Sequence, residues 1–250
     1  MKTAEAVSYL NDLLRVAEIE DYPTAFNGLQ VANSGDIHRI AAAVDASEAS
    51  IRGAAATGCD MLLVHHGLFW DGNPRVTDRN YRRFKLLLDH NIAVYSAHLP
   101  LDLHESFGNN HLLARELQVS IRGMFGKYKS SSIGVWGDLD IHREALTARL
   151  DDLIGARIRL IPGGPELIRR VGIVTGGAGS MIGEAAAAGF DAFITGEGAH
   201  HTYFDAMENG INVYYAGHYA TETFGVRALA EHLANKFQLE WEFLDLPTQL

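Results

Sequence analysis

Residues 56–67, ATGCDMLLVHHG, repeat the order of residue types in residues 187–198, AAGFDAFITGEG. Each stretch passes from small residues through a glycine and an aspartate into an apolar run that ends in polar groups. Two further pairs match in the same way: 91–102 (NIAVYSAHLPLD) with 211–222 (INVYYAGHYATE), and 39–47 (RIAAAVDAS) with 170–180 (RVGIVTGGAGS). The three blocks keep their order in both halves, which favours two similar modules over chance resemblance.

Short apolar runs alternate with helical patterns, such as residues 79–90 and 180–189. The runs cover residues 39–47, 60–67, 92–98, 131–137, 169–177, 191–197 and 211–218. Continuous apolar strands separated by helices are typical of α/β units whose sheets are covered on both faces. We therefore predict an α/β protein of two similar modules, 1–125 and 126–250, facing each other across a cleft. The boundary falls between 120 and 165, and the pair is also compatible with a single domain.

The composition narrows the classes of function. The 250 residues carry a formal net charge of −10, which disfavours nucleic-acid binding because such binding requires a basic surface. A small phosphorylated ligand remains compatible, since metal ions supply positive charge locally. The single cysteine, Cys59, excludes an intrachain disulfide and a thiolate metal cage. Its place before an apolar run predicts a buried small side chain rather than a reactive thiol.

No stretch approaches the roughly 18 consecutive apolar residues of a membrane span. The first twenty residues also lack the uninterrupted apolar core of a signal peptide. We therefore expect a cytoplasmic protein without a membrane partner.

Histidines and carboxylates directly follow the predicted strands, where the carboxyl ends of an open α/β sheet face the ligand crevice. The residues in question are His65, His66, His98, Asp102, His218 and Glu222. Four imidazoles and two carboxylates exceed the needs of one open tetrahedral site and suit two ions that share a bridging carboxylate. We predict two divalent metal ions per chain, of zinc, iron or manganese, in the cleft between the modules.

Each motif taken alone has an ordinary explanation. A lone H-x-x-x-D is more often a helix start than a ligand pair, but here two such units follow equivalent strands. The spacing of four places His98 beside Asp102, and His218 beside Glu222, if the chain turns helically after the strand. His65 and His66 would point to opposite sides of an extended strand, so both can bind metal only if the strand end twists.

Other polar residues near the same strand ends have weaker signals. Glu197 follows the strand 191–197, and His200 and His201 follow shortly after. We read these three as candidates for proton transfer or substrate contact, with an exposed helix-start role for the histidines as the alternative. Asp45 ends the first strand and either faces the crevice or caps a helix.

Two further motifs, one rich in glycine and one with amide side chains, each have two possible roles. The turn in GIVTGGAGS (172–180) could receive a phosphate on its backbone N–H groups, or its glycines could pack tightly against a neighbouring backbone. In FNGLQV (26–31), Asn27 and Gln30 bind something polar or close a loop.

Five motifs in order, FNGLQV, VHHGLFW, YSAHLPLD, TGEGAHH and AGHYATETFGV, resemble the NIF-three-like family, whose bacterial members are often labelled GTP cyclohydrolase I type 2 homologues. The resemblance covers residues 3–240 and corresponds to the short form without an inserted domain. It implies a dinuclear metal site on the same six residues and a ring-shaped homohexamer with the sites facing an internal cavity. Two positions depart from the family pattern: Phe26 replaces an aspartate, and Gly67 replaces a common proline.

The resemblance also implies an activity. The family label indicates a metal-dependent hydrolase of the GTP cyclohydrolase type, acting on a nucleotide-like small molecule. The alternative is a metal-binding scaffold or regulatory interaction protein without catalysis. A third possibility, a ring threaded by DNA, is disfavoured by the acidic net charge.

Overall fold

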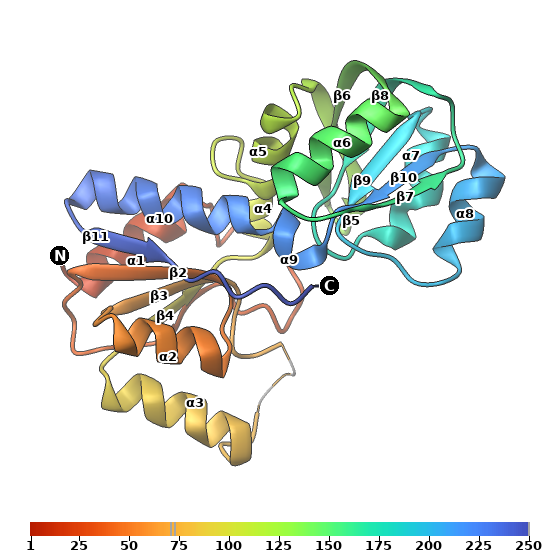
Figure 1. Ribbon diagram of the computed structural model, residues 1–250. Helices are drawn as coiled ribbons and strands as arrows, with labels where there is room; N and C mark the ends of the chain where they lie inside the picture. Colours follow the sequence, from red (N-terminus) through yellow and green to blue (C-terminus); the bar gives the residue numbers. More distant parts are fainter. Residues whose placement is uncertain (71, 73, 250) are drawn as a thin grey trace. The chain divides into compact units, whose positions relative to one another are not determined.

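The computed structural model describes residues 1–70, 72 and 74–249, and the predicted α/β class is confirmed (Figure 1). The chain forms two compact units. The first comprises Met1–Phe107 and Gly225–Leu246, and the second comprises Gly108–Phe224 with the residues from Pro247 onward. Each unit contains its own sheet, so each is described separately.

The sheet of the first unit has the strand order β1-β4-β3-β2-β11. Its strands are β1 (Gly28–Val31), β2 (Arg39–Asp45), β3 (Met61–His66), β4 (Ala93–Ser96) and β11 (Glu240–Phe243). All neighbouring pairs are parallel except β1 with β4. The central strands are buried along nearly their whole length, which explains their continuous apolar runs.

Helices cover both faces of this sheet (Figure 1). On one face lies α2 (Glu48–Ala56), with α3 (Asp78–Asp89) outside it, and the other face carries α1 (Thr3–Leu13) and α10 (Thr223–Phe237). Ser47 begins α2, because its hydroxyl accepts a hydrogen bond from the amide of Ser50. A short helix, α4 (Leu99–Asp102), follows β4.

The sheet of the second unit has the order β5-β6-β8-β9-β10-β7. Its strands are β5 (Ser120–Tyr128), β6 (Ser131–His142), β7 (Arg159–Pro162), β8 (Leu167–Ile173), β9 (Ala192–Thr195) and β10 (Asn212–Tyr215). Helices α5 (Asn109–Glu116) and α6 (Arg143–Ile154) contribute to a core with the buried side chains of β6, β8 and β9. The remaining elements are η1 (Gly179–Met181), α7 (Ile182–Ala187), α8 (Thr202–Asn209) and α9 (His218–Thr221).

The internal repeat appears in the topology of both sheets. Strands β2, β3 and β4 are parallel neighbours, and the matching β8, β9 and β10 are parallel neighbours too. An antiparallel strand flanks the last member of each set, β1 beside β4 and β7 beside β10. The two units therefore share a three-stranded parallel core with one antiparallel edge.

The compact units divide the chain differently from the predicted modules 1–125 and 126–250. The first unit ends at Phe107, outside the predicted range of 120–165, and it regains the segment Gly225–Leu246. The reason is a strand pairing that spans the chain, since β11 lies parallel to β2 with Glu240 opposite Arg39.

Among the described residues, no helix has the combined length and apolar character needed to cross a bilayer.

Candidate metal centre

The carboxyl end of β3 carries two histidines whose rings lie together. His65 is fully buried, His66 is the last residue of the strand, and their ring centroids are 4.8 Å apart. The end of the strand therefore does not send the two rings to opposite sides, as ideal alternation would. The ring of His98, which follows the neighbouring β4, lies 4.9 Å from that of His65.

These three histidines offer ring nitrogens that all lie within 4.8 Å of one another, so they can hold a metal ion together. Asp102 adds a carboxylate to the group, because its Oδ2 lies 3.5 Å from Nε2 of His65. Helix α4 brings it there: the amide of Asp102 donates to the carbonyl of His98, one helical turn back. The chain thus turns helically after β4, which is the condition that the H-x-x-x-D spacing requires, and Asp102 is only 6% exposed.

Each of these three histidines uses Nδ1 for a hydrogen bond within the protein. His65 Nδ1 donates to the carbonyl of Ala97 at 2.9 Å. His66 Nδ1 donates to Asp45 Oδ1, and His98 Nδ1 donates to Asp21 Oδ1, both at 2.9 Å. A donating Nδ1–H makes Nε2 the nitrogen whose lone pair can bind a metal ion, and it fixes the ring orientation. The three imidazole nitrogens and their tautomers therefore both fit a metal site.

Asp21 accepts the Nδ1 hydrogen bond of His98 and was not among the predicted site residues. Its side chain is only 5% exposed, and besides His98 it accepts hydrogen bonds from Asn27 Nδ2 and from the amide of Leu99. Asn27 in turn accepts the amide of His98. Burial acts to raise the pKa of Asp21, but His98 and the other donors outweigh it and lower the pKa below its usual value. No sequence motif marks Asp21, which lies 77 positions from His98.

The FNGLQV motif is explained by loop closure around these ligands. Gln30 donates from Nε2 to the carbonyls of Ala25 and Phe26, and its Oε1 accepts the amide of Leu68. Gln30 also fills the space next to Gly67, where an added Cβ would lie 2.1 Å from it. Of the two readings left open, the structure therefore supports the one in which the motif holds the loop after β3.

Aromatic side chains border the histidines of the first unit. The Trp70 ring lies edge-on to His98 at 4.8 Å and to His66 at 5.6 Å. Tyr22 lies 5.8 Å from His98 and remains 44% exposed. Partly exposed aromatic rings beside a metal-binding group provide surfaces on which a planar ligand can stack.

In the second unit, His218 and Glu222 form the equivalent pair after β10. Nε2 of His218 lies 3.2 Å from Glu222 Oε2, and Glu222 is 3% exposed. Nδ1 of His218 donates to Glu197 Oε1 at 2.8 Å. Glu197, predicted as a proton-transfer group, thus orients His218 in the way that Asp45 orients His66.

The carboxylates of Glu222 and Glu197 favour a positive charge at His218. Burial acts to lower the pKa of His218, but hydrogen bonds and charge from Glu222 and Glu197 outweigh it and raise the pKa to about 9. A buried carboxylate beside an imidazole requires positive charge, supplied either by a proton on the ring or by a metal ion. The pair is therefore suited to bind a divalent cation in place of that proton.

The glycines of the GIVTGGAGS turn allow Glu222 and His218 to approach closely. A Cβ on Gly176 would lie 2.2 Å from Glu222 Oε1 and 3.3 Å from Nε2 of His218. The amides of Gly176 and Ala178 already donate to the hydroxyls of Thr221 and Thr195. The structure thus favours tight packing over phosphate binding for this turn.

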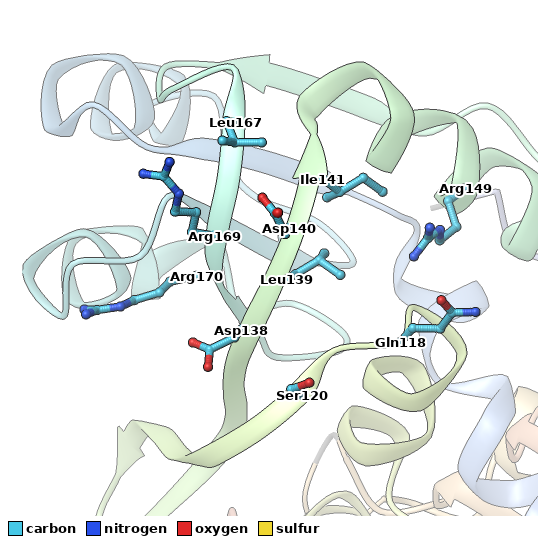
Figure 2. A pocket seen from close by; sticks show the side chains of 10 residues that line it. All are labelled: Gln118, Ser120, Asp138, Leu139, Asp140, Ile141, Arg149, Leu167, Arg169 and Arg170. Carbon is cyan, nitrogen blue, oxygen red and sulfur yellow. The ribbon is translucent and has the colours of Figure 1, made fainter.

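The remaining predicted residues lie at the start of α8. His200 and His201 are exposed, and the ring centroid of His200 lies 6.1 Å from that of Phe204 in α8. A hollow of about 790 Å³ also occurs in the second unit, lined among others by Asp138, Arg149 and Arg170 (Figure 2). It contains none of the predicted ligands, because it lies at the amino end of β8 rather than at the carboxyl ends of β9 and β10.

The chain belongs to the family described as Duf34/NIF3 (NGG1p interacting factor 3), which it matches over residues 1–249. The resemblance predicted from the motifs is confirmed. Proteins named GTP cyclohydrolase 1 type 2 homolog are similar along their whole length: that of Archaeoglobus fulgidus is 40% identical over 250 residues, covering 100% of both chains. That of Escherichia coli (strain K12) is 40% identical over 253 residues, covering 99% of each.

Solved structures agree with this assignment. The protein ybgI, whose function is described as unknown, superposes with a TM-score of 0.94 at 37% identity over 100% of both chains. TTHA1606 from Thermus thermophilus gives 0.90 at 39% identity, again over 100% of both chains. Reduced HcgD from Methanocaldococcus jannaschii gives 0.86 at 26% identity over 98% of each.

Proposed function

We propose that this protein is a metal-dependent hydrolase with two divalent ions per chain, acting on a nucleotide-like small molecule. The proposed ligands are the six residues at the strand ends: His65, His66, His98, Asp102, His218 and Glu222. Zinc, iron and manganese are all compatible with this mixture of imidazole and carboxylate.

The observation that supports it best is the shared hydrogen-bond pattern of the four histidines. In each of them Nδ1 bonds to an acceptor within its own unit, at 2.8–2.9 Å, so that Nε2 is the nitrogen that can bind a metal ion. In each unit a nearly buried carboxylate, Asp102 or Glu222, lies within 3.5 Å of such an Nε2. This arrangement is expected of metal ligands, since outer hydrogen bonds fix both tautomer and basicity.

Bound divalent ions would supply Lewis-acid activation of water and polarisation of the substrate. The chain's own residues would orient the ligands and the substrate. Glu197 and Asp45 hold imidazoles in place, and Trp70 with Tyr22 offers faces for a planar ring. We assign proton transfer to His200 or His201, two exposed imidazoles that lie just before α8.

The names of the relatives are consistent with a nucleotide-like substrate, since several are called GTP cyclohydrolase 1 type 2 homolog. The homohexamer implied by the motif resemblance is part of the same proposal. Light scattering of the purified protein would measure its molar mass and so test the homohexamer.

The decisive experiment measures metal and turnover on the same sample. Protein purified without a histidine tag is analysed for metal per chain and then incubated, metal-replete, with a nucleotide panel that includes GTP. We expect two ions per chain and hydrolysis of at least one compound. His66→Ala should lose both metal and turnover, whereas His90→Ala, an exposed histidine on the far end of α3, should lose neither.

Two results would count against the proposal in different ways. Fewer than one ion per chain in the metal-replete protein would contradict the dinuclear site. Two retained ions without turnover of any compound would favour the scaffold role over the hydrolase.

A further inference from the structure

In both units a tyrosine lies three residues before the proposed histidine ligand that follows β4 or β10. In the first unit it is Tyr95, which is fully buried and donates to Asn11 of α1. In the second unit it is Tyr215, which is only half-buried and is hydrogen-bonded to Thr202, the first residue of α8. Tyr215 therefore bonds to the element that directly follows the loop of Glu197.

The direction of the hydrogen bonds ties Tyr215 to this loop, residues 196–201. Thr202 gives its single hydroxyl proton to the carbonyl of Ala199, so Tyr215 must donate to Thr202. The tyrosine hydroxyl also lies against the loop backbone, because a Cβ added to Gly198 would lie 2.3 Å from it. The absence of a side chain at Gly198 thus leaves room for the hydroxyl.

The backbone of Glu197 has two further attachments. Its amide donates to the carbonyl of Gly176, and its carbonyl accepts the amide of Gly179, both at 3.2 Å. Its side chain accepts the Nδ1 hydrogen bond of His218 at 2.8 Å. Tyr215 adds an attachment on the C-terminal side of Glu197, so the carboxylate extends from a main chain that is held on both sides.

We infer that Tyr215 is a positioning residue of the proposed metal centre, because it holds the loop that aims Glu197 at His218. The inference rests on the proposed function and deepens it, since it extends the contacts that orient the ligands by one further residue. A loop held less firmly would let the carboxylate move away from the imidazole, which would then lose the partner that fixes its tautomer and orientation.

The adjacent Tyr214 provides a matched control. It points to the other face of β10, where it is fully buried and donates its hydroxyl proton to the carbonyl of Arg143. Tyr215→Phe and Tyr214→Phe therefore each remove one hydroxyl and one hydrogen bond from the same strand. In competition of the full-length protein with a chromogenic chelator, one zinc-binding step should weaken roughly tenfold in Tyr215→Phe and less than about twofold in Tyr214→Phe.

Cobalt(II) gives a second readout, which a purely structural change would not alter. The visible absorption of bound cobalt depends on the ligand geometry, so it should shift in Tyr215→Phe and match wild type in Tyr214→Phe. Thr202→Val removes the acceptor of the tyrosine hydroxyl and should shift the absorption in the same way. Thr202→Ser keeps a hydroxyl and should retain the wild-type spectrum. If Tyr215→Phe does not fold, the two Thr202 variants carry the test.

Equal zinc affinity and equal cobalt spectra of wild type and Tyr215→Phe would overturn the inference, and so would equal losses in Tyr215→Phe and Tyr214→Phe. Failure of the proposed function would look different, because wild type itself would then hold less than one zinc ion per chain. Hydrogen exchange of metal-free protein tests the loop in that case. The amides of residues 197–201 should exchange at least about fivefold faster in Tyr215→Phe than in Tyr214→Phe, and equal exchange would contradict the role of Tyr215.

Discussion

Asp45 and His66 end neighbouring parallel strands at the same register, and the carboxylate accepts the Nδ1 hydrogen bond of the imidazole at 2.9 Å. The strand pairing itself therefore sets the orientation of the proposed ligand. A histidine that donates to a carboxylate is also more basic at Nε2 and binds metal more tightly.

Asp45→Ala should weaken zinc binding by about 10- to 100-fold without unfolding the chain, because His66 loses the partner that orients it. Competition with a chromogenic chelator would measure the affinity. Asp89→Ala, which removes an exposed carboxylate paired with Lys85, serves as the control and should leave the affinity unchanged. Equal affinities of Asp45→Ala and wild type would contradict a role for Asp45 in ligand positioning.

Asp21→Ala should lower the free energy of unfolding by about 3 kcal/mol, since it leaves several nearly buried donors without an acceptor. The lowered pKa of Asp21 also predicts a pH dependence in metal-free protein. Its contribution is present above about pH 4, the unfolded-state value, and is lost as the pH falls through the lowered folded-state pKa. Urea denaturation at a series of pH values would measure both effects.

The exposed Asp12→Ala on α1 is the matched control for that series. If Asp21→Ala and Asp12→Ala destabilised the protein to the same small extent, the hydrogen-bond network around His98 would not hold the loop.

Metal binding should release a proton from His218. In metal-free protein the pKa of His218 is raised to about 9, so the ring is charged at pH 7.5 and an incoming ion must displace that proton. The apparent affinity should therefore rise with pH up to about 9 and level off above it. Calorimetry in buffers of different ionisation enthalpy counts the released protons, and Glu197→Gln should reduce the count at pH 7.5.

Gly176→Ala should displace Glu222, and it should lower both the metal content per chain and the free energy of unfolding. The glycine has φ +70°, and its Cβ would lie 2.2 Å from Glu222 Oε1. Gly155→Ala is a close control because φ is +71° there and nothing lies within 4 Å of the added Cβ. Both variants should lose about 1 kcal/mol from the left-handed backbone conformation. Only Gly176→Ala should lose more than that and lower the metal content per chain.

Cys59 should react with a thiol reagent only after unfolding. The thiol is 3% exposed, and burial raises its pKa to about 11, so almost no thiolate forms at pH 8. We expect less than one-tenth of the single thiol to be modified within an hour in native protein, and complete modification in denaturant. Fast labelling of the native chain would place Cys59 in an open environment instead.

The seven strands predicted from apolar runs all occur, whereas β1, β5, β7 and β11 were not predicted. Interior parallel strands are buried on both faces and read as continuous apolar runs, but these four include edge strands with partly exposed, mixed patterns. The pairing of β11 with β2 joins residues about 200 positions apart, and no local pattern encodes it.

The sequence alone determined the repeated strand-and-helix pattern, because apolar periodicity follows from the local order of residues. It also determined that histidines and carboxylates follow the strands, and the ends of parallel strands meet at one edge of a sheet. Only the tertiary structure decided the partners of those histidines. Asp21 and Asp45 reach His98 and His66 across 77 and 21 positions, through loop closure and strand register. A hydrogen bond between distant residues depends on how the strands align in space, which the identity of an aspartate does not specify.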